Sequence, residues 1–85
     1  MKRGILVFDQ CDQQWRVWIG QHSYWIDQGY TFELRILNRY YKAFLEYDSD
    51  WFITLNNDVK FILHTHEVYK IRIDMKDYIE FNLPF

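Results

Sequence analysis

Residues 31–47, TFELRILNRYYKAFLEY, decide the fold, because their apolar side chains fit two different periodicities. At helical spacing, an i, i+3, i+4, i+7, i+8 stripe forms from Leu37, Tyr40, Tyr41, Phe44 and Leu45. At strand spacing, apolar residues alternate with charged ones on either side of a turn at Asn38-Arg39. Aromatic and β-branched residues are enriched here, and Thr31 lacks the glutamate three residues later that would complete a helix cap. We therefore expect two strands.

Short apolar runs flank this stretch on both sides, at residues 4–8, 15–19, 51–55, 59–63 and 68–73. Polar turns separate them, including Asp48-Ser49-Asp50 and Asn56-Asn57-Asp58. Residues 20–29 are rich in turn residues, and we expect their apolar side chains to plug one end of the core. The pattern predicts an all-β fold, a small SH3-like or OB-like barrel of about six to seven short antiparallel strands. Closure would protect the edges of so short a sheet.

The composition predicts one domain spanning residues 1–85, with residues 74–85 as a C-terminal extension. Aromatic residues make up 21% of the chain, so a disordered chain is excluded. The formal net charge of −2 argues against a large basic field. The single cysteine cannot form an intrachain disulfide, and no signal peptide or membrane span is evident. We expect a cytoplasmic protein, with no membrane partner.

One set of short motifs resembles a known family. It consists of Met1-Lys2-x-Gly4-x-Leu6, Gly29-x-x-Phe32-Glu33-x-x-Ile36, Leu45-Glu46-x-Asp48-x-Asp50-Trp51-Phe52 and Val68-x-x-Ile71-Arg72-Ile73. These residues resemble an uncharacterised family of short all-β proteins from Gram-positive bacteria and their mobile elements. The resemblance covers residues 1–73 and implies strands at residues 31–47, a barrel and a mobile-element setting. The chain departs from the family pattern at the Asn38-Arg39-Tyr40 turn and in the residues after Ile73.

Residues capable of catalysis or metal binding are present but lack the spacing that such chemistry needs. His64 and His66 share one side of an extended segment, yet no further ligand stands at a fixed offset from them. The carboxylates around residues 46–58 fail the calcium-loop pattern, because Ile53 and Val59 occupy the positions of the required glycine and glutamate. Cys11 has no base or cation beside it in the sequence. We expect no enzyme activity, no cofactor and no metal.

The most suggestive pattern is a set of cations and rings that strand alternation places on the outer side of the domain. The candidate partner-binding residues are Trp18 and Phe44 as anchors, with Arg16, Arg35 and Lys42 around them. A protein partner is the leading hypothesis, bound through this aromatic patch and a free strand edge. Single-stranded nucleic acid is the alternative, because bases stack on rings while cations meet phosphates. Inhibition of a host enzyme is a third, and the C-terminal segment could pair two copies into a homodimer.

Overall fold

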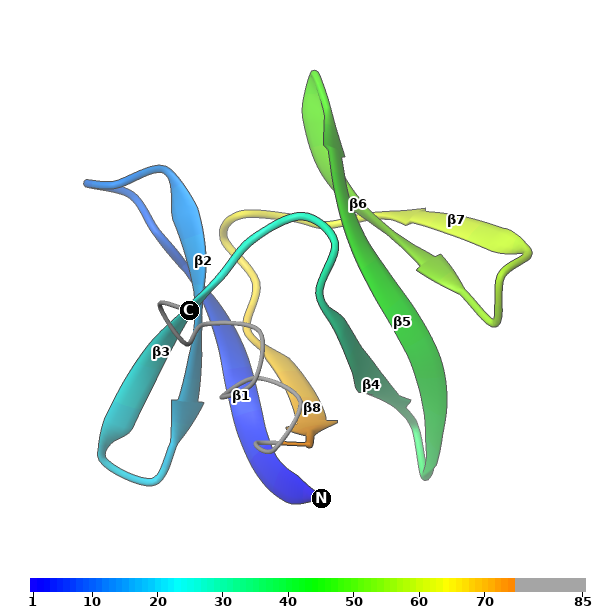
Figure 1. Cartoon of the computed structure of the whole chain (residues 1–85), viewed down its shortest axis with the longest axis horizontal. Helices are drawn as coiled ribbons and strands as arrows, with labels where there is room; N and C mark the ends of the chain where they lie inside the picture. Colours follow the sequence, from blue (N-terminus) through cyan, green and yellow to red (C-terminus); the bar gives the residue numbers. More distant parts are fainter. Residues whose placement is uncertain (75–85) are drawn as a thin grey trace, which may run out of the picture.

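The computed structural model describes residues 1–74, which form eight strands and no helix. The strands are β1 (Lys2–Asp9), β2 (Gln14–Ile19), β3 (His22–Ile26), β4 (Thr31–Ile36), β5 (Arg39–Asp48), β6 (Asp50–Leu55), β7 (Val59–Ile62) and β8 (Tyr69–Ile73). All of them belong to one antiparallel sheet with the order β3-β2-β1-β8-β4-β5-β6-β7. The last strand, β8, therefore lies in the middle and joins the two halves of the sheet (Figure 1).

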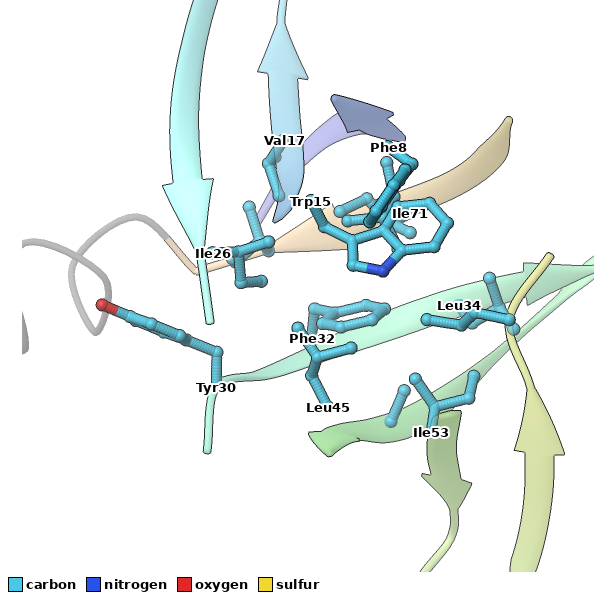
Figure 2. Close-up of a cluster of buried hydrophobic side chains, with 14 of the residues drawn as sticks. Phe8, Trp15, Val17, Ile26, Tyr30, Phe32, Leu34, Leu45, Ile53 and Ile71 are labelled. Carbon is cyan, nitrogen blue, oxygen red and sulfur yellow. The ribbon is translucent and has the colours of Figure 1, made fainter. Parts of the chain in front are cut away.

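The sheet bends so that one of its faces encloses the core. Figure 2 shows side chains of β1, β2 and β3 on one side of the core, facing those of β4, β5 and β6 on the other. Trp15, Val17 and Ile26 come from the first half, and Phe32 and Leu45 from the second; all five are buried. Strand alternation turns the remaining side chains outward. That outer face carries the candidate binding residues.

The stretch that decides the fold is a β-hairpin, as the strand interpretation predicted. Strands β4 and β5 pair from Thr31 opposite Phe44 to Ile36 opposite Arg39. The turn lies one residue earlier than expected, at Leu37-Asn38, where Leu37 has a positive φ of 57°. Of the positions predicted to face inward, Leu34 and Ala43 are among those that are buried, whereas Ile36 and Tyr47, near the strand ends, are 37% and 51% exposed.

Two expectations need correction and one lies outside the described residues. Residues 20–29 are not only a plug, since they contain β3 and a tight turn at Gly20, whose φ is 61°. The strand count is eight, and a closed barrel is not confirmed, because β3 and β7 end the order and no ladder joins them within residues 1–74. The all-β class is confirmed. The predicted C-terminal extension, apart from Asp74, falls outside the part of the chain that the structure describes.

Candidate functional site

The five candidate residues lie on the outer face, but the sheet does not bring them together. Trp18 is on β2 and Phe44 is on β5, with β1, β8 and β4 between them. Neighbouring strands lie about 4.8 Å apart, so the backbones of β2 and β5 are separated by four spacings, or roughly 19 Å measured along the sheet. The single patch predicted around both anchors therefore divides into separate surfaces.

Arg16 is held by neighbouring side chains. Its Nε lies 3.2 Å from Oδ2 of Asp9, and a guanidinium nitrogen donates to the Ser23 hydroxyl at 2.9 Å. The guanidinium also stacks over the Trp25 ring, 3.7 Å from its centre. A cation held on three sides in this way fastens β2 to β1 and β3, and has little freedom to reach a partner.

Phe44 belongs to an apolar surface at the other end of the sheet. Phe44 stands opposite Thr54, and Phe52 stands opposite Ile62 and diagonally next to Phe44. Phe44 and Ile62 are 38% and 42% exposed, which is high for apolar side chains on paired strands. We call Phe44, Phe52 and Ile62 the Phe44 patch. It reaches β7, the edge strand on this side of the sheet.

Arg35 belongs to a different surface, a shallow groove across β1, β8, β4 and β5 with a volume of about 310 Å³. Its lining includes Arg3, Ile5, Arg35, Tyr40 and Lys70, which we call the basic groove. None of the residues that line it is acidic. Lys42 is not in this lining; it stands opposite Glu33, in a separate depression that also contains Asp74.

Arg72 forms the border between the basic groove and Lys42. Its Nε donates to the Glu33 carboxylate, and its guanidinium lies over the Tyr40 ring, 4.1 Å from the ring centre. This contact fixes the Tyr40 ring at the side of the groove. Glu33 therefore neutralises Arg72 and leaves the cations inside the groove uncompensated.

Arg3 and Tyr40 also line the basic groove, and neither was predicted as a binding residue from the sequence. The alternation on β1 already placed Arg3 and Ile5 on the outer face of the sheet, because Leu6 and Phe8, at the other parity, are buried. The missing information was strand partnership, because only the pairing of β1 with β8 sets Arg3 beside Arg72. Those two strands are separated by some sixty residues, and periodicity within a segment says nothing about its partner.

A second, larger pocket of about 450 Å³ lies where four loops meet. Tyr47 and Trp51 form one wall, with ring centres 4.8 Å apart, while Asp27 and Asp50 stand among glutamine side chains. No lysine or arginine lines this pocket. The charge of its lining is therefore opposite in sign to that of the basic groove.

The groups considered for catalysis or metal binding lie apart. Among residues 1–74, no three histidine, cysteine or carboxylate side chains are close enough to hold a metal ion. Cys11 is exposed in the β1–β2 turn, where its N–H donates to the Asp9 carboxylate. Burial raises the pKa of the Tyr69 phenol, whose oxygen accepts a hydrogen bond from the His64 N–H at 2.8 Å. That phenol packs against Trp15 and Phe61 in a structural role.

These surfaces define a small all-β domain that carries two exposed surfaces, one apolar and one basic, on the outside of a bent sheet. The chain belongs to the family described as a domain of unknown function, DUF5348, whose model matches residues 4–73. The resemblance to an uncharacterised family is thus confirmed. Searches of curated proteins and of solved structures find no match. Within residues 1–74 the chain forms no helix that could cross a membrane.

Proposed function

We propose that this domain is a non-catalytic binding module that recognises a protein partner through the Phe44 patch and the neighbouring edge of β7. The observation that supports this most is the continuity of the two features. Phe52 and Ile62 face each other on β6 and β7, so the apolar surface ends at a strand whose other side has no pairing strand within residues 1–74. A partner segment could add a strand there and place its side chains on the patch.

The exposure of the patch supports a contact of this kind. Phe44 and Ile62 are 38% and 42% exposed, and Ile62 belongs to the edge strand itself. An open edge with apolar side chains invites association unless charge or a covering segment blocks it. Lys60 lies over the Phe52 ring at 4.3 Å and supplies the only cation on β7. A cytoplasmic, mobile-element setting belongs to the same proposal.

The test is capture of a partner from a lysate of the source cells with three versions of the protein. Phe44→Ala removes the central ring of the patch, and Ile62→Lys adds a charge to the edge strand. Val68→Ala is the matched control, because Val68 is 55% exposed and lies in the β7–β8 loop, outside the patch. We expect a protein that is captured after nuclease treatment, lost with the first two variants and kept with the third. Capture that survives both patch substitutions contradicts the proposal.

Single-stranded nucleic acid is the second candidate, and a different observation favours it: the basic groove contains cations without carboxylates. The dependence of binding affinity on ionic strength distinguishes the two functions. Binding through phosphates weakens steeply as ionic strength rises, whereas an apolar protein contact is much less sensitive.

A further inference from the structure

The basic groove concentrates positive charge that the rest of the domain does not neutralise. Arg3, Arg35 and Lys70 come from three adjacent strands, β1, β4 and β8, and line one depression. Within residues 1–74, the ion pairs join Arg16 to Asp9 and Arg72 to Glu33, and neither includes these three side chains. Arg35 donates from Nε to the carbonyl of Leu37, which leaves its terminal nitrogens available.

The register also places like charges beside one another. Arg3 stands directly opposite Arg72 on the neighbouring strand. Like charges at opposed positions destabilise a sheet, and the Arg72–Glu33 ion pair offsets part of this repulsion, but within residues 1–74 no carboxylate pairs with Arg3 itself. A bound anion would remove this repulsion. The unpaired cations therefore favour a complex with a polyanion.

We propose that the basic groove binds the phosphate backbone of a single-stranded nucleic acid, with the bases stacking on rings at its two sides. Tyr40 lines one side. On the other side, Trp18 stands opposite Ile5, which belongs to the groove. From β2 to β5 this surface spans four strand spacings, or roughly 19 Å.

The shape of the surface favours unpaired strands over a duplex. The groove crosses the outer face of a sheet, and the residues described contain no helix to enter a major groove. A sheet that offers rings between cations suits bases that are free to stack. DNA and RNA share this chemistry. The inference uses a different surface from the Phe44 patch, so either one can fail alone.

The experiment measures the fluorescence anisotropy of labelled fifteen-nucleotide oligo(dT), oligo(rU) and a duplex of the same length. The matched variants are Lys70→Gln in the groove and Lys60→Gln on β7, which lower the net charge equally. Each phosphate contact on a single strand contributes a salt slope of about 0.7, so losing one reduces affinity about eightfold near 50 mM salt. We expect that loss for Lys70→Gln and less than about a twofold change for Lys60→Gln.

The salt dependence and a ring substitution give two further readouts. Three phosphate contacts predict a slope of about −2 in log affinity against log salt, falling to about −1.4 in Lys70→Gln. Trp18→Leu should weaken binding without changing the slope, because stacking releases no counterions. Thermal melting checks that each variant is folded, and Phe44→Ala should bind the oligonucleotides as the unmodified chain does.

Several outcomes overturn the proposal. These are the absence of binding to both single strands near 50 mM salt, an equal loss in the two lysine variants, and a duplex that binds as tightly as the single strands. Preference for oligo(dT) or for oligo(rU) identifies the natural ligand as DNA or RNA, and either supports the inference. A partner that binds the groove as a protein would be captured after nuclease treatment and lost in Lys70→Gln, and that result also overturns it.

Discussion

Replacing Leu37 by glycine should stabilise the protein, although leucine is the more hydrophobic residue. Leu37 is 88% exposed at the tip of the β4–β5 hairpin and has a φ of 57°. Side chains with a Cβ atom rarely adopt this left-handed conformation, because the Cβ approaches the following carbonyl oxygen. Glycine adopts it without that contact.

The expected gain can be worked out from three terms. Removing the left-handed strain contributes about 1–2 kcal/mol. Greater freedom of glycine in the unfolded chain costs about 0.5–1 kcal/mol. Only about a tenth of the Leu37 surface is covered, so the lost burial is worth about 0.2–0.3 kcal/mol. The sum runs from about −0.3 to +1.3 kcal/mol, so we expect a net stabilisation of about 0.5 kcal/mol, which in a domain of this size raises Tm by about 2–4 °C.

Thermal melting followed by circular dichroism measures this change, with Leu37→Asn and Leu37→Ala as companions. Asparagine tolerates the left-handed region and should also stabilise, whereas alanine keeps the strain and should leave Tm nearly unchanged. If the turn were instead at Asn38-Arg39, position 37 would belong to the strand. Glycine there would lower the stability by about 0.5–1 kcal/mol. A loss of stability of about 0.5–1 kcal/mol in Leu37→Gly would thus refute the observed turn and the register that follows from it.

Other substitutions test the packing of the sheet. Gly4→Ala should lower the free energy of unfolding by about 1–3 kcal/mol, as overpacking does, because the new Cβ would collide with the backbone oxygen of Trp18. Leu45→Ala should cost about 2–5 kcal/mol in urea unfolding, since Leu45 is fully buried between β4 and β6. The Tyr69 phenol should ionise above its ordinary pKa of 10, because burial disfavours the phenolate. Its contribution to stability is complete below pH 10 and is lost as the pH rises through the folded pKa, so alkaline unfolding should be less steep in Tyr69→Phe.

Local patterns predicted the parts of this fold that depend on local chemistry. The alternation of Phe32, Leu34, Ala43 and Leu45 indicated which side chains would be buried, and they are. The polar runs at residues 48–50 and 56–58 predicted turns, and the positive φ values of Ser49, Asn56 and Asn57 lie there. In each case the deciding interactions join residues within a few positions of one another.

Other features depend on contacts that a local pattern does not contain. Strand β3 was missed because its residues are mixed in polarity, and Arg16 stabilises it by stacking on Trp25 and bonding to Ser23. The turn at Leu37 was missed because asparagine accepts positive φ more readily than leucine, yet the pairing of β4 with β5 sets the register. Residues on several strands form each candidate surface. Their grouping follows from the strand order, which the sequence analysis could not derive.

The net charge of the chain likewise does not predict the charge of each surface. A sum of −2 indicates no strong field around the whole molecule, but a ligand responds to the charges within about a Debye length of its site, some 8–10 Å in physiological salt. The basic groove is lined by Arg3, Arg35 and Lys70 and by no acidic residue, and the neighbouring Glu33 is paired with Arg72, while Asp27 and Asp50 line the larger pocket without a cation. The two sites would attract opposite ligands although the composition is nearly balanced. Selection among partners in this domain therefore depends on how the bent sheet distributes its charges, and the insertion of β8 between β1 and β4 brings the three cations together.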